Sequence, residues 1–221
     1  MEIELRTVSK RFGSIRALQS IDVHLRSGEL LLVTGPNGSG KTTLLRILAT
    51  ALFPDDGDYL WNGQPVHKAL DQARQSIGFL PERMGLYEDL TVQENLIFWS
   101  RVYGQSSTTE KFFAALKLWQ LEAYRSRPAS TLSQGMVRRT GLAKITMQSP
   151  KLILLDEPFN GLDEENTSIL VRTLGEWKGE GKAMAIATHQ PETLAFMEDR
   201  RLSLEKQGNV YDVPTFSAVA P

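Results

Sequence analysis

The chain has 221 residues, of which 41% are hydrophobic and 23% charged, proportions that are ordinary for a folded globular protein. The 25 Lys and Arg residues balance 26 Asp and Glu residues, so the sequence lacks the basic excess expected of a nucleic-acid-binding protein. It contains no cysteine, which excludes disulfides, thiolate metal sites and cysteine nucleophiles.

The first predicted elements are antiparallel strands. Ile21, Val23 and Leu25 alternate with polar residues, the pattern of a half-buried strand, and the turn "RSGE" follows them. Leu30–Val33 is continuously apolar, which predicts a strand covered on both faces. We expect neither a secretion signal nor a membrane span, because the N-terminus lacks an apolar signal core and no apolar run approaches about 20 residues.

The stretch "GPNGSGKT" (Gly35–Thr42) follows this strand and precedes segment 42–52, whose apolar period predicts a helix. It fits the phosphate-binding pattern G-x-x-x-x-G-K-[ST] in its strand–loop–helix context, and a tight turn without a ligand is the alternative. Its glycines let backbone N–H groups surround phosphate oxygens, Lys41 adds a charge for the β- and γ-phosphates, and the hydroxyl of Thr42 can bind Mg²⁺. We predict a nucleoside triphosphate site formed by Gly35, Pro36, Asn37, Gly38, Ser39, Gly40, Lys41, Thr42 and Thr43.

The middle of the chain changes from strands to helices. "DYLWNG" predicts a short strand and turn, and "SIGFLPE" a strand that ends at its proline. Residues 90–148 are helical in pattern, with breaks at "GQSSTT" and "RSRPAS". Thr91 and Glu94 have the spacing of a capping box, which predicts a helix start.

The last third returns to an α/β pattern. "KLILLDEP" predicts a buried strand, and it is followed by a helix over 163–178, a strand over 183–188, a short helix after Pro191 and a hairpin in "RLSLEKQGNVYDV". The predicted fold class is α/β, with a P-loop NTPase core, an N-terminal antiparallel β subdomain and a helical insertion. We expect a single domain over 1–221, divided into a core of 1–81 and 150–213, a helical part of about 82–149 and a tail of 214–221.

Two carboxylates follow the strand in "LILLDE". Asp156 at the strand's carboxyl end can hold Mg²⁺ through water, and Glu157 can polarise an attacking water as a general base. The alternative is that both acids only cap the strand. His189 ends another apolar run, 32 residues after Glu157. Either it is a structural histidine or the topology returns it to the same sheet edge, where its imidazole can bond the γ-phosphate.

The stretch "TLSQGMVRR" (131–139) is polar, carries one glycine and opens a helix. A helix start of this kind presents N–H donors to an anion. It therefore has the character of a second anion site, distant in the sequence from Lys41, and the alternative is a helix cap alone.

The order of these motifs resembles the ATP-binding subunit of an ABC transporter over nearly all of the chain. "GPNGSGKTT" resembles Walker A, "LSQGMVRR" the signature sequence and "LILLDEP" Walker B. "NGLD" resembles the D-loop and "THQ" the switch-histidine loop. The resemblance implies a RecA-like core, with ATP and Mg²⁺ as ligands.

In this family two subunits pair head to tail, and each signature helix faces the P-loop of the other subunit. The resemblance implies that Ser133, Gln134 and Gly135 contact ATP held by the partner, and that Asp163 stabilises the paired interface. It also implies that Phe12 stacks on adenine, although a core phenylalanine is the alternative.

Several positions depart from the family pattern. Glu82 replaces the usual Gln, and its carboxylate can still ligate Mg²⁺ while it adds charge near the triphosphate. Gln134 replaces Gly, Met136 replaces Gln, and Asn160 replaces Ser. "FLPERMGLYEDLTVQENL" with a Gly-Met signature resembles the exporter group with ABC-2 permeases, and "LWNGQPVHK" resembles the ATPase of the cytochrome c maturation haem exporter.

The expected function is ATP hydrolysis that drives a separate integral membrane permease in export. The expected partners are a second ATP-binding subunit, most economically an identical copy, and the permease, which receives motion through the segment after Glu82. The expected location is cytoplasmic, on the inner face of the cell membrane through the permease, with no nucleic acid bound. The alternatives are a soluble ABC-type ATPase acting on ribosomes or DNA, whose paired cassettes or long coiled coils the sequence lacks, and a non-hydrolysing module, which Glu157 and His189 disfavour.

Overall fold

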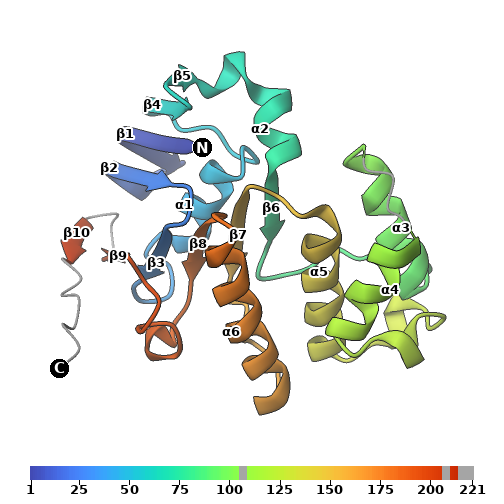
Figure 1. Cartoon of the computed structure of the whole chain (residues 1–221). Coiled ribbons are helices and arrows are strands. Elements are labelled where there is room, and N and C mark those ends of the chain that lie inside the picture. Colours follow the sequence, from blue (N-terminus) through green and yellow to red (C-terminus); the bar gives the residue numbers. More distant parts are fainter. Residues whose placement is uncertain (105–108, 206–209, 214–221) are drawn as a thin grey trace.

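The computed structural model describes residues 1–104, 109–205 and 210–213. The fold contains two β-sheets, and the helices lie between them and beside the larger one (Figure 1). The predicted fold class, an α/β core with an antiparallel sheet near the N-terminus and a helical insertion, is confirmed. The predicted tail 214–221, the turn of the closing hairpin and residues 105–108 of the expected helix break lie outside the described residues.

The larger sheet consists of β3 (Leu30–Thr34), β6 (Ile77–Leu80), β7 (Leu152–Asp156), β8 (Ala183–Ala187), β9 (Arg200–Leu204) and β10 (Val210–Val213). Its strand order is β10-β9-β3-β8-β7-β6. Neighbours from β9 to β6 pair in parallel, and β10 pairs antiparallel with β9, so the expected closing hairpin is confirmed.

The α-helices are α1 (Lys41–Leu48), α2 (Leu70–Ser76), α3 (Val92–Val102), α4 (Thr109–Leu118), α5 (Gln134–Gln148) and α6 (Glu164–Gly179). Short 3₁₀ turns cover Val66–Lys68, Glu122–Tyr124, Ala129–Thr131 and Pro191–Thr193. Helices α3, α4 and α5 lie together beside the β6 edge of the larger sheet, whereas α6 lies beside its middle strands (Figure 1).

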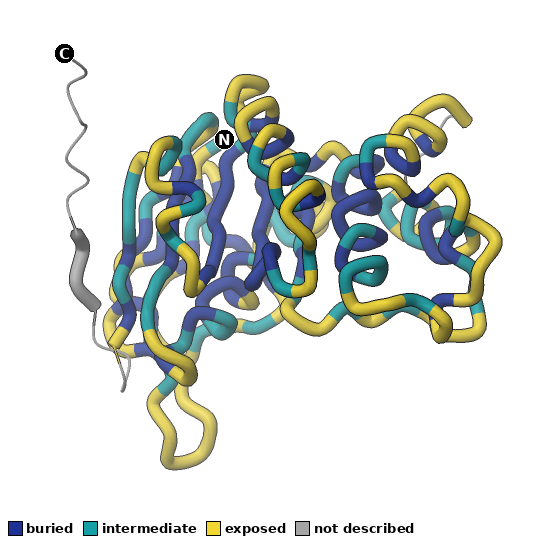
Figure 2. Tube along the Cα trace, turned by 90° about the horizontal axis from the view of Figure 1, so that it is seen from below, coloured by how far each residue is buried: buried dark blue, intermediate teal, exposed yellow. Residues whose placement is uncertain are grey.

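The continuous apolar strands are buried on both faces, as predicted. Leu31 and Val33 belong to a hydrophobic cluster with α1 and the smaller sheet, whereas Leu30 and Leu32 belong to a cluster with α3–α6. Successive side chains of a strand point to opposite faces, so one strand contributes to both clusters. Figure 2 shows these buried strands inside the molecule and exposed positions along the outer helices.

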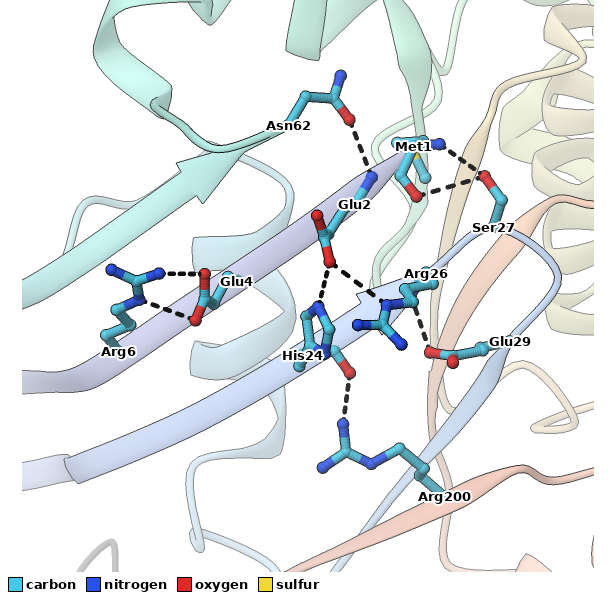
Figure 3. Close-up of polar contacts among 10 residues, drawn as sticks. All are labelled: Met1, Glu2, Glu4, Arg6, His24, Arg26, Ser27, Glu29, Asn62 and Arg200. Carbon is cyan, nitrogen blue, oxygen red and sulfur yellow. Dashed lines mark hydrogen bonds and ion pairs between the residues drawn. The ribbon is translucent and has the colours of Figure 1, made fainter.

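The smaller sheet is antiparallel, with the order β2-β1-β4-β5, and consists of β1 (Glu2–Phe12), β2 (Ile15–Arg26), β4 (Asp56–Trp61) and β5 (Gln64–Pro65). The predicted alternating strand is the second half of β2, and its apolar residues Ile21, Val23 and Leu25 are buried. Figure 3 shows a polar contact between the two sheets, in which Arg200 of β9 donates to the carbonyl oxygen of His24 in β2. Within the smaller sheet, Glu2 of β1 bonds the ring of His24 and the guanidinium group of Arg26.

The predicted capping box at the start of α3 is confirmed. The backbone N–H of Glu94 donates to Thr91 Oγ1 at 3.2 Å, and the backbone N–H of Thr91 donates to Glu94 Oε2 at 2.8 Å. Both bonds satisfy N–H groups that a helix start leaves without intrahelical partners.

Two details of the fold differ from expectation. The helix predicted over 42–52 ends at Leu48, because the carbonyl oxygen of Arg46 accepts the N–H groups of Ala51 and Leu52 and Thr50 takes φ 55°. Helix α2 was not predicted. Among its seven residues only Ala73 is buried, so its sequence carries no apolar period.

Lys144 of α5 is a buried charge. Lys144 is 8% exposed. Its Nζ lies 3.4 Å from the carbonyl oxygen of Phe79 and 5.0 Å from the centre of the Trp99 ring. Burial lowers the pKa of Lys144 from 10.5 to about 8. Between these values the unfolded chain holds a proton that the folded chain lacks, so this group's contribution to stability improves as pH rises through that window.

We therefore expect Lys144→Met to raise the free energy of unfolding by about 1–3 kcal/mol at pH 7, where the folded wild-type chain buries an ammonium group. The gain should shrink from about pH 8 upward, because the folded lysine is then neutral. Urea unfolding of both chains at pH 7 and pH 10 measures the difference, and Lys151→Met at an exposed lysine is the control. An equal gain at both pH values, or a loss at pH 7, would contradict the prediction.

Candidate functional site

The predicted phosphate loop runs from β3 to α1 and is packed between two strands. A Cβ atom on Gly35 (φ 139°) would lie 2.1 Å from the carbonyl oxygen of Leu204 in β9. A Cβ atom on Gly40 (φ 102°) would lie 2.3 Å from the carbonyl oxygen of Ala17 in β2. Both positions therefore require glycine, and the loop is held against both sheets.

Helix α1 begins at Lys41, and no side chain caps it at Gly40. Its first N–H groups are therefore free to bind an anion. Lys41 is buried, and its Nζ donates to the carbonyl oxygens of Gly35 at 2.8 Å and Pro36 at 3.2 Å. The ammonium group thus lies over the loop, and the buried Ser39 Oγ in the same loop has no hydrogen-bond partner within the described chain.

Asp156 and Thr42 lie together, as a shared metal site requires. Thr42 Oγ1 donates to Asp156 Oδ2 at 2.7 Å, although the two residues are 114 positions apart. Asp156 is 0% exposed, and its Oδ1 has no hydrogen-bond partner in the described chain. Burial raises the pKa of Asp156, and the bond from Thr42 opposes that rise. A hydroxyl beside a carboxylate with one unpaired buried oxygen is a donor set that fits Mg²⁺.

Glu157 follows Asp156 with a left-handed backbone at φ 48°, and its N–H donates to the carbonyl oxygen of Ala187 at 2.8 Å. It is 8% exposed. Its Oε2 lies 2.7 Å from Nδ1 of His189 and accepts the backbone N–H of His189 at 3.2 Å. The predicted return of His189 to this sheet edge is therefore observed, and its bond to Glu157 was not anticipated.

The hydrogen bonds around His189 assign its tautomer. The carboxylate of Glu157 accepts, so Nδ1 carries the proton, and Nε2 accepts from the side-chain amide of Gln190 at 3.3 Å. The ring is half exposed, whereas Glu157 is buried. A half-exposed imidazole ring and a buried carboxylate are thus joined at the carboxyl ends of β7 and β8.

The predicted signature stretch begins α5. Ser133 is the N-cap, and its Oγ accepts the N–H of Met136 at 3.3 Å. A Cβ atom on Gly135 would lie 2.3 Å from the carbonyl oxygen of Gly161, so this helix start packs on the loop before α6. Within the described residues no hydrogen bond joins 131–139 to the phosphate loop of the same chain, and Ser133 and Gln134 are exposed.

Asp163 is the N-cap of α6. Its Oδ1 accepts the backbone N–H and the side-chain amide of Asn166, each at 2.8 Å, and these bonds lower the pKa of Asp163. The residue expected in the paired interface therefore has a definite role within its own chain.

Phe12 lies at the end of β1, opposite Ile15, and is 49% exposed. The alternative of a core phenylalanine is therefore wrong. Nζ of Lys10 lies 5.8 Å from the centre of the Phe12 ring and 2.5 Å from Asp55 Oδ1. The hairpin that carries Phe12 also contains Ala17, which contacts Gly40, so the ring and the phosphate loop belong to one packed unit.

Glu82 is exposed, and its backbone is held by a residue that sequence reasoning missed. Arg138 of α5 donates to the carbonyl oxygens of Glu82 at 2.6 Å, Pro81 at 2.9 Å and Asp156 at 3.3 Å. The neighbouring Arg139 is also an arginine, but it donates to the carbonyl oxygen of Trp119 on another side of α5. Only the position on the helix distinguishes the two arginines.

In the described part of the chain, no helix combines the length and apolar character needed to cross a membrane.

The ABC transporter family model matches residues 18–160. The chain belongs to the ABC transporter family. This ABC chain is 36% identical over 188 residues to the cytochrome c biogenesis ATP-binding export protein CcmA 2 of Cupriavidus metallidurans, with 85% of this chain and 89% of the relative covered. It is 34% identical to the sulfate/thiosulfate import ATP-binding protein CysA of Pseudomonas putida, with 97% and 69% covered. It is also 34% identical to the Nod factor export ATP-binding protein I of Burkholderia orbicola, with 92% and 68% covered.

Solved ABC cassettes have the same fold. The dimeric structure of a bacterial ABC transporter cassette has a TM-score of 0.88 at 24% identity, with 97% of this chain and 99% of that chain covered. A dimeric post-hydrolysis cassette bound to ADP and Pi has a TM-score of 0.87 at 25% identity, with the same coverage. The chain is therefore the ATP-binding subunit of an ABC transporter and an ATPase, and the alternative of a ribosome- or DNA-acting ATPase is set aside.

Proposed function

We propose that this ABC subunit hydrolyses ATP in a head-to-tail pair of identical copies and thereby drives an export permease of the ABC-2 type. One observation carries the proposal. One sheet edge brings together Lys41, Thr42, Asp156, Glu157 and His189, whereas the exposed start of α5 makes no hydrogen bond to the phosphate loop within the described residues. The proposed phosphate-binding and hydrolytic residues of one copy are thus separate from a second helix start suited to anions.

The phosphate loop binds the triphosphate in this proposal. Backbone N–H groups of the loop after Pro36 and of the start of α1 donate to phosphate oxygens, and Lys41 moves its ammonium group from loop carbonyls to the β- and γ-phosphates. Phe12 stacks on adenine, and its exposure at the tip of the β1–β2 hairpin supports that role.

Thr42, Asp156 and Glu82 would hold Mg²⁺. The bond between Thr42 and Asp156, and the unpaired Oδ1 of Asp156, support the first two ligands. Arg138 fixes the backbone of Glu82 to that of Asp156, which supports the third. When bound, the ion neutralises charge that develops on the phosphate oxygens.

Glu157 acts as the general base. Its carboxylate takes a proton from water as the water oxygen bonds the γ-phosphorus, and the bond from that phosphorus to the β-phosphate oxygen breaks, leaving its electrons on ADP. The bonds from His189 hold the carboxylate in place. Nε2 of His189 is the atom that would contact the γ-phosphate, as a proton donor when both ring nitrogens carry protons and the Nδ1 bond to Glu157 is kept.

Pairing of two copies completes the site. Ser133, Gln134 and Gly135 of one copy contact the γ-phosphate bound by the other, and Asp163 lies in the shared interface. Packing of Gly135 on Gly161 supports this arrangement, because it places the signature and the D-loop side by side. We propose that the whole chain acts as one cassette, with a core of 1–81 and 150–213 and a helical part over 82–149 that contacts the permease.

The export direction rests on the relatives named for cytochrome c biogenesis export and Nod factor export, which stand beside an import relative.

The segment after Glu82 supplies the surface for the permease. Tyr87 and Val102 are exposed hydrophobic residues, and Asn95 ties Tyr87 to α3 by accepting its N–H at 2.8 Å and donating to its carbonyl at 3.0 Å. The cassette is then peripheral on the cytoplasmic face of the membrane through its permease.

The permease contact is tested with Tyr87→Ala/Val102→Ala. We expect wild type produced in its own host to sediment with membranes and the double variant to remain in the supernatant, because apolar area needed for docking is lost. Soluble ATPase activity of the double variant should match wild type, which shows that it folds. Phe196→Ala, at an exposed phenylalanine far along the chain, is the control. Equal membrane sedimentation of the double variant would overturn this surface assignment.

A further inference from the structure

Arg138 is a buried arginine that links three segments. It is 6% exposed, lies one turn into α5, and donates to carbonyl oxygens of Pro81, Glu82 and Asp156. A planar guanidinium supplies several donors in fixed directions, which suits acceptors from different segments. The signature helix, the segment of Glu82 and the end of β7 are thereby held at one point.

The charge of Arg138 lies among carboxylates. Burial lowers the pKa of Arg138, and the nearby charges of Asp156, Glu82 and Glu157 oppose that effect. A buried cation is costly unless opposite charges and hydrogen bonds offset its lost hydration. Here three carbonyls bind it, and the nearby charges of three carboxylates favour its charged form.

Arg138 also lines a cavity between α5 and the segment of Glu82. The cavity has a volume of about 350 Å³, and its lining includes Glu82, Met84, Leu132, Val137 and Asn160. The space beside Glu82 would let this exposed side chain change position if its backbone were released. The bonds from Arg138 restrict that backbone.

We propose that Arg138 is a positioning residue for Glu82: it fixes the Glu82 backbone relative to Asp156, and its charge permits a carboxylate at position 82. The inference deepens the proposed function, because it rests on hydrolysis of Mg·ATP at this site. It follows that residues 82 and 138 form a matched pair. A glutamine at position 82 would have no charge, so it would need the arginine less.

A double-mutant cycle tests the pair with Arg138→Gln, Glu82→Gln and both changes together. We expect Arg138→Gln to reduce kcat/KM for ATP in both backgrounds. The fold reduction should be about ten times larger with the native Glu82 than in the Glu82→Gln variant. The Mg²⁺ concentration for half-maximal activity should rise with Arg138→Gln in the native background and change little in the Glu82→Gln background. A purely structural arginine would lower the melting temperature without this dependence on the side chain at position 82.

Arg139→Gln is the matched control, because Arg139 also donates to backbone carbonyls from α5 but on another side. We expect its effect on kcat/KM to be the same in the native and the Glu82→Gln backgrounds. If Arg138→Gln does not fold, Arg138→Lys replaces it in the cycle, and its ammonium group should give a smaller dependence of the same sign.

Equal losses from the Arg138 change in both backgrounds would overturn the inference. Absence of Mg-dependent ATP hydrolysis by the wild-type chain and its pair would instead overturn the proposed function. The two failures are therefore distinguishable in one set of assays.

Discussion

Glu157→Gln should lower the rate of ATP hydrolysis by at least about 100-fold while ATP still binds. The amide has nearly the shape of the carboxylate, and its oxygen can still accept the bonds from His189, but it cannot take a proton from water. Phosphate release measures turnover, and calorimetry measures ATP affinity. Undiminished hydrolysis would refute the assignment of Glu157 as the base.

The control for this change is Glu164→Gln, an equivalent substitution at an exposed position in the first turn of α6. We expect its turnover to equal that of wild type. A change at Asp156 separates the base from the metal ligand. Loss of Asp156 should weaken the binding of both Mg²⁺ and ATP, whereas loss of the Glu157 carboxylate should leave ATP binding intact.

Ser133→Arg should abolish ATP-induced pairing of the chain. An arginine at this exposed position loses the N-cap bond of Ser133, which costs about 1 kcal/mol, but it has room to fit. It brings bulk and charge into the shared nucleotide site. Sedimentation velocity with ATP, in the Glu157→Gln background that retains ATP, measures the pair. Ser130→Arg, three residues earlier at another exposed position, is the control and should pair normally.

Mixing variants makes the test of pairing sharper. Lys41→Ala has no working phosphate loop, and Ser133→Arg has no working signature, so each alone should be inactive. A mixed pair holds one intact site, from the loop of one copy and the signature of the other. Neither variant should pair with itself, so the pairs that form from equal amounts are mixed. Each mixed pair has one site of two, and the mixture should therefore recover up to about half of wild-type activity. No recovery, or normal pairing by Ser133→Arg, would refute the cross-copy role.

Patterns local in sequence predicted much of the fold. The apolar run Leu30–Val33 and the Thr91–Glu94 spacing each reflect a physical rule that operates within a few residues, and both were confirmed. The expected length of the first helix was wrong, because its end depends on how the carbonyl of Arg46 is satisfied. Helix α2 was missed because a helix with one buried residue leaves no apolar period.

The candidate site was predictable where motif spacing carries it, and less so where distant segments meet. Residues 35–43, 156 and 157 were singled out from the sequence, and the hydrogen bond between Thr42 and Asp156 fits the expected shared metal site. The bond from His189 to Glu157 and the position of Arg138 were not foreseen. Each depends on which way a side chain points across two or three elements, and sequence spacing does not encode that direction.

The left-handed backbone of Glu157 has a consequence for protein engineering. A residue with a side chain at φ 48° is less stable than glycine there by roughly 1–2 kcal/mol, so folding and chemistry make opposite demands on this one position. Selection of heat-resistant variants would favour glycine or asparagine at 157 and would discard the acid at the same time. Thermal screening of this subunit therefore requires a parallel assay of turnover, since the most heat-resistant variants would include inactive ones.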